Sequence, residues 1–373
     1  MHQTDYSVEH VVEISVIVPT YKEHDNIVPM VKCLDEALDG HRWEVIFVDD
    51  DSPDGTSELV RNIAIHDPRV RCVQRVGRRG LSTAAIEGIL ASSAPFCAVI
   101  DGDMQHDEKL LPVMLEIIKH EQLDVVSGSR YVEGGGLGDW HRSRVRISKL
   151  ATWLSSKVLH ADLSDPMSGF FMIRRSTFEE CMRDLSGIGY KILLDIFATS
   201  KKTLRYRELP YEFRTRSAGE SKLDSQVAWE FFMLLLDKMI GRFIPVRFVT
   251  FALVGGLGVF VHMACVWLMM SGLGTQFMEA QTVATLVAMT SNYALNNILT
   301  YRDVRLRGWG WLKGWLSFSL VCSVGAVGNI GVASYIYTQD TTWVVASLSG
   351  IIVGTVWNYA VTSVYTWHKP KNA

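Results

Sequence analysis

The feature that most limits what this chain can fold into is the near absence of charge from four long segments in its last third. They read FVTFALVGGLGVFVHMACVWLMM (248–270), EAQTVATLVAMTSNYALNNILTY (279–301), GWLSFSLVCSVGAVGNIGVASYIY (314–337) and WVVASLSGIIVGTVWNYAVTSVYTW (343–367). Each is as long as the ~20 residues that a helix needs to cross a bilayer. Buried core helices of a large soluble domain are the alternative, but they explain neither this length nor four such segments in succession. The sequence therefore predicts four transmembrane helices.

Basic residues in the connecting loops predict how these helices are oriented. Two of the loops, SGLGTQFM and TQDTT, contain no Lys or Arg. Lys and Arg instead precede the first segment, separate the second from the third and follow the fourth: Arg242, Arg247, Arg302, Arg305, Arg307, Lys313, Lys369 and Lys371. Because loops rich in Lys and Arg stay in the cytoplasm, both ends of the chain and residues 1–225 are predicted to be cytoplasmic.

Residues 1–225 have the mixed composition of a soluble enzyme and alternate between strand and helix patterns. The apolar, β-branched runs EISVIVPTY (13–21) and WEVIFVDDDS (43–52) are separated by a helical stretch, and VRCVQRV, TAAIEGILASS and FCAVIDGD continue the alternation. Strands that are apolar throughout, alternating with helices, favour a parallel α/β sheet covered on both faces. The chain, with 373 residues, is long enough for two domains.

The composition also argues against several other classes of protein. A net charge of −3 points to neither nucleic acid nor a polyacidic partner. The six cysteines show no CxxC pairing and no metal-ligand spacing, which indicates reduced, packed thiols. The N-terminal MHQTDYSVEHVVE has no long apolar stretch, so a cleaved signal peptide is not expected.

Polar clusters follow the predicted strands at the points where the strands end. They read PTYKE, VDDDSPDGT and DGDMQHD. Open α/β sheets bind their ligands at this carboxyl edge. A dinucleotide site would need GxGxxG after the first strand, and neither that motif nor a Walker loop is present. The stretch VGRRGLSTAA (76–85) could bring backbone and Arg78 or Arg79 to a phosphate, or could be an ordinary turn into a helix.

The acidic stretch DGDMQHDE (101–108) calls for a positive partner, since carboxylates this close raise one another's pKa. An EF-hand calcium loop is excluded, because its fifth, sixth and twelfth positions would be Gln105, His106 and Pro112. A solvated turn at a strand end is the plain alternative. Two Asp and a Gln supply few oxygen ligands, which suits Mg²⁺ or Mn²⁺ completed by water and a nucleotide diphosphate. Asp107 and Glu108 are expected at the start of the next helix.

Taken together, the motifs resemble glycosyltransferase family 2, and within it the polyprenyl-phosphate hexose synthases, the group of dolichol-phosphate mannose synthases. The matching stretches span nearly all of residues 14–225, in family order: VIVPTYKEHDNI, VDDDSPDGT, RRGLSTA, IDGDMQHDE, SGSRY, DPMSGFFMIRR and RTRSAGESKL. The tail resembles the GtrA-like membrane proteins, through FxxVG (251–255) and the repeated elements SNYALNNILTY and WNYAVTSVYTW. The repeat suggests two related hairpins, or parallel selection of Asn and aromatic residues at an interface. Asn297 and Ser363 stand where related proteins often have Arg.

The resemblance implies a fold, a domain layout and site residues. A cytoplasmic GT-A-like α/β catalytic domain (1–225) would be followed by a juxtamembrane helix (226–245) and an all-α, four-helix transmembrane domain (246–373). By resemblance, the donor-binding residues are Pro19, Tyr21, Glu23, Asp49, Asp50, Asp101, Gly102, Asp103, Gln105, Arg130 and Arg216. The acceptor phosphate would meet Arg144, Ser148, Arg214 and Lys222, with Ser221 nearby, and the catalytic set would be Asp103, Arg130, Asp165, Arg216 and Lys222. The metal ligands would be Asp101, Asp103 and Gln105.

The implied reaction is inverting transfer of a hexose from a nucleotide sugar to the phosphate of a membrane polyprenol. GDP-mannose is the expected donor and UDP-glucose the alternative. For the membrane domain, a lipid-sugar flippase is a competing role, but no acid, Lys or Arg occupies the centre of a predicted helix. Anchoring, lipid presentation or homo-oligomerisation is therefore favoured for it.

Two amphipathic segments could deliver the lipid to the site. In RVRISKLATWLSSKVL (144–159) apolar residues share one helical face and basic residues the other, and SQVAWEFFMLLLDKMIGRFIP (225–245) is apolar except for a narrow polar stripe. Such patterns are typical of helices at a membrane surface. Packing against the sheet is the alternative for both, because amphipathicity does not distinguish lipid from protein.

Overall fold

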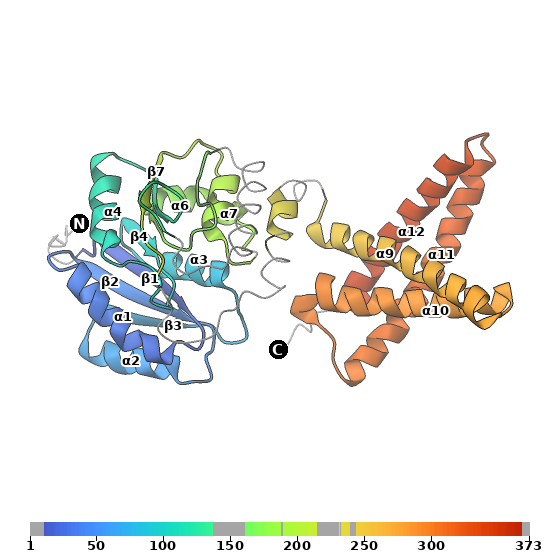
Figure 1. Ribbon diagram of the computed structural model, residues 1–373, viewed down its shortest axis with the longest axis horizontal. Helices are drawn as coiled ribbons and strands as arrows, with labels where there is room; N and C mark the ends of the chain where they lie inside the picture. Colours follow the sequence, from blue (N-terminus) through green and yellow to red (C-terminus); the bar gives the residue numbers. More distant parts are fainter. Residues whose placement is uncertain are drawn as a thin grey trace, which may run out of the picture. The chain divides into compact units, whose positions relative to one another are not determined.

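The structure is a computed structural model, which describes residues 11–136, 161–187, 189–214, 231, 233–238 and 244–367 (Figure 1). The chain divides into two compact units, Met1–Met239 and Ile240–Ala373. The first unit is built on a β-sheet and the second on long helices. The predicted boundaries at residues 225 and 246 stay predictions, since much of 215–243 lies outside the described residues.

The described residues of the first unit form one seven-stranded sheet. The strands are β1 (Ile14–Thr20), β2 (Trp43–Asp49), β3 (Val70–Gln74), β4 (Phe96–Val99), β5 (Val125–Ser129), β6 (Phe171–Arg174) and β7 (Tyr206–Pro210). Their spatial order is β3-β2-β1-β4-β6-β5-β7. Strands β1 to β4 pair in parallel, whereas β6 runs antiparallel to both of its neighbours, β4 and β5. The sheet is therefore mixed, and the prediction of a parallel sheet was wrong at β6, whose short apolar run reads alike in either direction.

Helices cover both faces of this sheet, as the apolar strands predicted. Along β1, Val16 and Val18 pack into one hydrophobic cluster and Ile17 into the other, because successive side chains point to opposite faces. Residues of α1, α2 and α4 join the first cluster, and residues of α3, α6 and α7 join the second. These helices are α1 (His24–Ala37), α2 (Thr56–His66), α3 (Leu81–Ala91), α4 (Leu110–His120), α6 (Arg175–Cys181, continued by the 3-10 turn Met182–Asp184) and α7 (Ile192–Thr199).

Part of the predicted juxtamembrane segment packs on the second of these clusters. Residues 233–238 are helical, and Leu234 and Leu235 are buried against α7 and its neighbours. For this stretch, packing on the domain is what the structure shows, in place of a free apolar face toward lipid. The other amphipathic segment, 144–159, lies outside the described residues.

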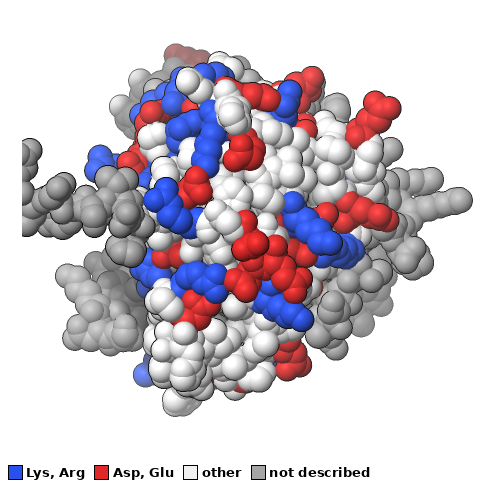
Figure 2. Space-filling model, turned by 90° about the vertical axis from the view of Figure 1, so that its left-hand side faces the viewer, with Lys and Arg blue, Asp and Glu red and all other residues white. Residues whose placement is uncertain are grey.

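The surface of the first unit carries mixed charge on the face shown in Figure 2. Lys and Arg side chains there lie among Asp and Glu side chains. Several basic residues of the unit form ion pairs on its surface, such as Arg69 with Asp35 and Arg207 with Glu121. Surface pairs of this kind contribute little to stability, but they offset single-sign attraction to an anionic surface.

The second unit consists of long helices whose bounds follow the four predicted segments closely. They are α9 (Val246–Trp267, continued by a π-helical turn, Leu268–Gly272), α10 (Phe277–Leu295, continued by Asn296–Thr300), the 3-10 turn Arg302–Val304, α11 (Trp309–Tyr337) and α12 (Trp343–Tyr365). Among the described helices, Val246–Gly272 and Trp309–Tyr337 are long and apolar enough to cross a membrane. Two of the four predicted spans thus meet this criterion, and the other two stay a prediction.

Contacts within the second unit relate the α9–α10 and α11–α12 hairpins to each other. Residues 251–258 read FALVGGLG and residues 318–325 read FSLVCSVG, so that Phe251 matches Phe318. The two Phe rings contact each other, and each also contacts a Tyr of the opposite hairpin: Phe251 meets Tyr359, and Phe318 meets Tyr293. Tyr293 and Tyr359 occupy matching positions of the repeat noted in the sequence. Such reciprocal contacts support two related hairpins joined about a pseudo-twofold axis.

Asn297, which stands where related proteins often have Arg, is part of this packing. Its amide donates to the carbonyl of Leu306 (3.0 Å), and its Oδ1 accepts from the Leu306 N–H (2.9 Å) and from the indole N–H of Trp367 (3.1 Å). The Trp367 ring stacks on Tyr301 with centroids 4.0 Å apart. Asn297 therefore ties the loop after α10 to the end of α12, which is a structural role.

Two matching glycines should be essential to the hairpins. A Cβ at Gly258 would overlap the side-chain amide of Asn292, and one at Gly325 would overlap that of Asn358. Replacing either glycine with Ala should destabilise the unit by roughly 1–3 kcal/mol through overpacking. The measurement is the apparent Tm of the full-length protein in detergent.

Gly256→Ala and Gly328→Ala are matched controls, since a Cβ at either position meets nothing within 4 Å. These variants should leave Tm unchanged or raise it slightly, because Ala has the higher helix propensity. Equal Tm values for all four variants would contradict the close helix approach at Gly258 and Gly325.

Candidate active site

Three polar loops meet at one edge of the sheet because β1, β2 and β4 run parallel. They are the loops that follow Thr20, Asp49 and Val99. Carboxyl ends of parallel strands lie side by side, and ligands of such sheets bind there. The structure therefore brings together the site residues that were predicted on these loops.

Asp49 organises the loop after β2 from the inside. Its side chain is fully buried, and its two oxygens accept hydrogen bonds from the Ser52 N–H (2.9 Å) and from the hydroxyls of Ser52 (2.5 Å), Ser57 (2.5 Å) and Thr20 (3.2 Å). With this many partners, the carboxylate acts as the scaffold of the DDDSPDGT loop. Direct contact of Asp49 with the donor stays a prediction.

Asp50 forms a buried ion pair with a cation that the sequence analysis missed. Arg75, only 1% exposed, donates to Asp50 Oδ1 at 2.6 Å and also to the Gly80 carbonyl and the Thr83 hydroxyl. The other oxygen of Asp50 accepts the Gly80 N–H at 2.7 Å. Burial raises the pKa of Asp50, while the Gly80 N–H and the Arg75 charge oppose that rise. The pair holds the loop that leads into α3.

The signal for Arg75 was present in the sequence but weak. It is an Arg directly after the strand VRCVQ, and three Asp stand at the end of the neighbouring strand, at positions 49–51. Strand order was needed to place β2 and β3 side by side.

The residues predicted around the nucleoside lie at the same edge. Pro19 is buried within β1, and the ring of Tyr21 lies 4.3 Å from the guanidinium of Arg79. Glu23, at the start of α1, accepts a hydrogen bond from the Asn26 amide at 2.7 Å. A cation over an aromatic face is a favourable contact that positions Arg79 at the rim of the site. Nucleoside binding by Pro19, Tyr21 and Glu23 stays a prediction.

The acidic loop after β4 carries two carboxylates, of which Asp101 lies close to the DPMSGF loop. Asp103 is 8% exposed, and the side chain of Asp101 is 31% exposed. Gly169 approaches Asp101 so closely that a Cβ there would lie 2.9 Å from Asp101 Oδ2. Gly102 is also confined, because its own Cβ would lie 3.3 Å from Thr20. Gly169 therefore allows the DPMSGF loop to approach Asp101, and Gly102 allows the acidic loop to lie close to the end of β1.

His106 lies in the interior, beside Asp101. It is buried, stacks on Phe170 with ring centroids 5.3 Å apart, and its Nδ1 accepts the Asp101 N–H at 3.2 Å. Burial lowers the pKa of His106 to about 4, although the charge of Asp103 opposes the shift. A neutral His106 with its proton on Nε2, which lies 3.8 Å from Asp101 Oδ2, supports the backbone and side chain of Asp101.

Gln105 and Arg214 are linked, but Arg214 is engaged by acidic residues. The Gln105 amide donates to the Arg214 carbonyl at 2.9 Å, and the Arg214 N–H donates to the Gln105 carbonyl at 3.0 Å. The Arg214 guanidinium pairs with Asp107 at 2.6 Å and Glu108 at 2.8 Å. Asp107 and Glu108 lie in the turn before α4 and not in its first turn, where they were expected, and their pairs give Arg214 a structural role in closing this loop. Contact of Arg214 with an acceptor phosphate stays a prediction.

Arg130 and Asp165, both predicted as catalytic, form a bidentate pair. Their side chains meet at 2.7 Å and 2.9 Å and are 9% and 0% exposed. The carboxylate of Glu208, on β7, accepts the N–H groups of Ser164 and Asp165 at 2.8 Å and 3.0 Å and so fixes the loop that carries Asp165. A planar guanidinium held in this way keeps one orientation at the edge of the site.

Lys191, just before α7, is a second residue that the sequence analysis missed. Its ammonium donates to the Met167 carbonyl at 3.1 Å, beside Asp165. Burial and the nearby Arg130 lower the pKa of Lys191, and the charges of Asp101 and Asp165 oppose that shift. Lys191 is thus a cation close to both Asp101 and the Arg130–Asp165 pair. Its only sequence signal was a lone Lys at the start of the apolar run KILLDIF.

The remaining predicted site residues cannot be placed. Arg144, Ser148, Arg216, Ser221 and Lys222 lie outside the described residues.

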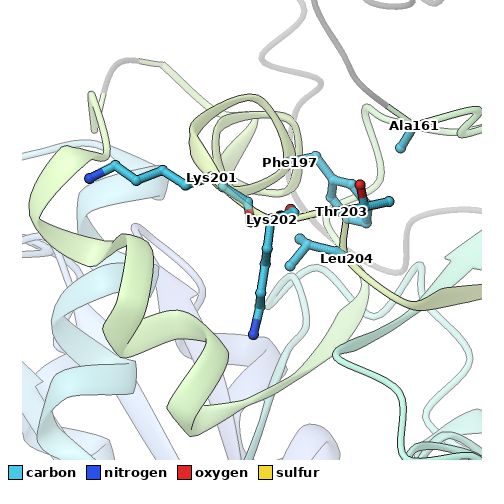
Figure 3. A pocket seen from close by; sticks show the side chains of 7 residues that line it. Ala161, Phe197, Lys201, Lys202, Thr203 and Leu204 are labelled. Carbon is cyan, nitrogen blue, oxygen red and sulfur yellow. Dashed lines mark hydrogen bonds between the residues drawn. The ribbon is translucent and has the colours of Figure 1, made fainter.

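A small cavity of about 110 Å³ lies away from the acidic loop, between the end of α7 and β7 (Figure 3). Lys201 and Lys202, which help to line it, extend away from Ala161, and their ammonium groups pair with Asp184 and Glu180. A cavity of this size, whose cations are already paired, does not fit a nucleotide sugar. The edge of the sheet remains the candidate active site.

Comparisons with known proteins support this assignment. Residues 15–182 match the family described as Glycosyl transferase family 2, and residues 250–367 match the GtrA/DPMS transmembrane domain. A dolichol-phosphate mannosyltransferase of Pyrococcus furiosus is 33% identical over 357 residues, which are 95% of this chain and 99% of that relative. A dolichol-phosphate mannosyltransferase of Saccharomyces cerevisiae is 33% identical over 241 residues, covering 62% of this chain and 89% of the relative.

Among solved structures, glucosyl-3-phosphoglycerate synthase from Mycobacterium tuberculosis, in complex with Mn²⁺, UDP and phosphoglyceric acid, is 20% identical with a TM-score of 0.46. That likeness covers 61% of this chain and 78% of the other, and it is too distant to bear on substrate or metal. Identity over almost the whole length of the Pyrococcus furiosus protein, by contrast, includes both units of the chain. The chain therefore belongs to glycosyltransferase family 2, in the group of polyprenyl-phosphate hexose synthases with a GtrA-like membrane domain.

Proposed function

We propose that this chain transfers mannose from GDP-mannose to the phosphate of a membrane polyprenol, with inversion at the anomeric carbon. The observation that carries the proposal is the 33% identity to a dolichol-phosphate mannosyltransferase along 95% of the chain. The soluble unit and the membrane unit are thus matched together in one relative with a named activity. The same relatives favour mannose over the alternative, a glucosyltransferase that uses UDP-glucose.

A divalent cation, Mg²⁺ or Mn²⁺, fits the residues at the end of β4. Asp101 and Asp103 offer carboxylate oxygens and Gln105 an amide oxygen, the hard ligands that both ions accept. Gly169 leaves open the space beside Asp101 that any larger residue would fill. When bound, the cation would stabilise the negative charge of the departing nucleoside diphosphate.

The basic residues of the site then have to align two anionic substrates. The acceptor is a phosphate monoester whose second pKa is about 6, so at neutral pH it attacks without a general base. Arg130, held by Asp165, and Lys191, beside Asp101, would place phosphate oxygens and offset their repulsion. Fixed charges of this kind contribute through orientation and electrostatic stabilisation. Arg216 and Lys222 are proposed for the same task from the family motif.

We assign the second unit to the membrane with four spans and with both chain ends in the cytoplasm. The two helices that are long and apolar enough to cross a bilayer, and the match to the GtrA/DPMS transmembrane domain, support this proposal. Glu279 lies in the first turn of α10, and the described helices of the second unit carry no Asp, Glu, Lys or Arg near their centres. Anchoring, lipid presentation or homo-oligomerisation thus fits the unit better than translocation of a charged lipid-sugar.

The substrate assignment is tested by direct transfer. Purified protein, polyprenyl phosphate and Mg²⁺ or Mn²⁺ are incubated separately with labelled GDP-mannose and labelled UDP-glucose. Label should enter the lipid fraction from GDP-mannose, and chelation of the metal should stop it. Transfer from UDP-glucose alone would overturn the mannose assignment, and no transfer from any nucleotide sugar would overturn the enzyme proposal.

The metal assignment predicts that Asp103→Asn loses most of its activity while staying folded. Removing a carboxylate ligand should lower kcat by about 10²-fold or more, the range seen when a group that stabilises charge in the transition state is lost. Asp25→Asn, at an exposed carboxylate of α1, is the matched control and should keep wild-type kcat. Wild-type turnover in Asp103→Asn would remove this residue from the metal ligands.

The bidentate pair predicts that Arg130→Lys is not a conservative change. Lys keeps the positive charge but cannot form two parallel hydrogen bonds to Asp165, so the cation would lose its fixed orientation. We expect kcat/KM to fall about 10-fold to 100-fold. Arg69→Lys, at an exposed pair with Asp67 on the surface, should leave kcat/KM unchanged. Equal activity of both variants would show that the orientation of Arg130 is not used in catalysis.

A further inference from the structure

Asp195, in the first turn of α7, holds two separate parts of the chain with its two carboxylate oxygens. Oδ2 accepts hydrogen bonds from the N–H and hydroxyl of Ser186 (2.9 Å and 2.8 Å) and from the N–H of Gly187 (3.1 Å). Oδ1 lies 2.5 Å from the ammonium of Lys238. Asp195 is 1% exposed, so these contacts are made away from solvent.

Lys238 belongs to the helical stretch 233–238, which packs on the domain through Leu234 and Leu235. Its side chain is 9% exposed and also donates to the Thr199 hydroxyl at 2.7 Å. Helix α9, the first helix of the membrane unit, begins at Val246, eight positions further along the chain. Among the described residues of the first unit, Lys238 is therefore the buried basic residue that lies closest in sequence to the membrane unit.

The turn at Ser186 and Gly187 leads directly to the candidate active site. Gly187 lies against Thr83 of α3, where a Cβ would come within 3.0 Å of the Thr83 methyl group. Two positions later, the Gly189 carbonyl accepts the Ser82 N–H at 3.3 Å. Lys191 follows, with its ammonium on the Met167 carbonyl beside Asp165. The position of Lys191 thus depends on a turn that Asp195 holds.

A buried ion pair contributes little net stability, because both charges lose their hydration. What a carboxylate adds over an apolar side chain is two acceptor atoms with separate directions. Here one atom is committed to the turn before Lys191 and the other to the segment that continues toward α9. Loss of Lys238 would leave Asp195 buried without its cation and would disturb the turn that shares the carboxylate.

We propose that Asp195 and Lys238 are positioning residues for glycosyl transfer, which place Lys191 and make its position depend on the segment that leads to the membrane unit. The proposal rests on the proposed function, in which Lys191 aligns the substrate phosphates. Neither residue touches a substrate; both act through the turn at Ser186 and Gly187.

The test compares Lys238→Met with Lys201→Met in the full-length protein in detergent. Lys201 pairs with Asp184 at the surface, where ion pairs matter little. In Lys238→Met, kcat should fall about 10-fold to 100-fold with the KM for polyprenyl phosphate unchanged. Hydrogen exchange of the Ser186 and Gly187 amides should become faster. Lys238→Arg, which keeps a cation within reach of Asp195, should restore kcat toward the wild-type value.

The double variant Asp195→Asn/Lys238→Met, which removes both charges, covers the case in which Lys238→Met alone does not fold. It should fold, yet keep a reduced kcat and faster exchange at Ser186 and Gly187. Wild-type kcat and exchange in the double variant, or losses in Lys201→Met equal to those in Lys238→Met, would overturn the proposal. If the wild-type protein transferred no sugar, the proposed function would fail, whereas the exchange data would still decide whether Lys238 holds the turn.

Discussion

Compensation of negative charge at one edge of the sheet is the interaction on which the rest of the soluble unit depends. Parallel strands β1, β2 and β4 bring Asp49, Asp50, Asp101 and Asp103 to a common edge, where unbalanced carboxylates would repel one another. Arg75 neutralises Asp50, hydrogen bonds satisfy Asp49, and Arg130 pairs with Asp165 close by. Asp101 lies against Gly169 of the DPMSGF loop, and Asp103 follows it on the same acidic loop. The edge is thereby divided into carboxylates that build loops and carboxylates that suit a cation.

Buried cations do more than balance charge, because each one joins elements that are distant in sequence. Arg75 connects β3 to the loops after β2 and before α3, Arg130 connects β5 to the loop before β6, and Lys238 connects the segment 233–238 to α7. These pairs tolerate little change in geometry, because losing one partner would leave the other as an unpaired buried charge. In the membrane unit, helices are joined by close approach at Gly258 and Gly325 and by stacked aromatic rings. Packing of this kind is needed there because the hydrophobic effect does not drive association between helices in an apolar environment.

The predictions that the structure confirms needed only local sequence patterns. Those that it corrects or adds to depended on contacts between residues far apart in the chain. The packing of helices on both faces followed from apolar strands, a local pattern, and so did the meeting of three polar loops at one edge of the sheet. That the active site lies at this edge stays a prediction. The antiparallel direction of β6 was missed, because a four-residue apolar strand reads alike in either direction. The donor-binding role of Asp49 stays a prediction, and the structure adds that its carboxylate holds its own loop. Arg75 and Lys191 were missed, because their acidic partners lie on other strands and loops.

The sequence by itself determined the class of the protein: a soluble α/β unit with acidic strand ends, a tail of four long apolar segments, and motifs in the order of glycosyltransferase family 2. These properties follow from the identity and local spacing of residues, which dictate strand, helix and solubility in water or lipid. Only the tertiary structure decided which carboxylates organise loops and which cations they meet. It also decided that part of the juxtamembrane segment packs on the sheet domain. The reason is that charge pairing and burial depend on distances between residues that are far apart in the chain, and no local pattern records those distances.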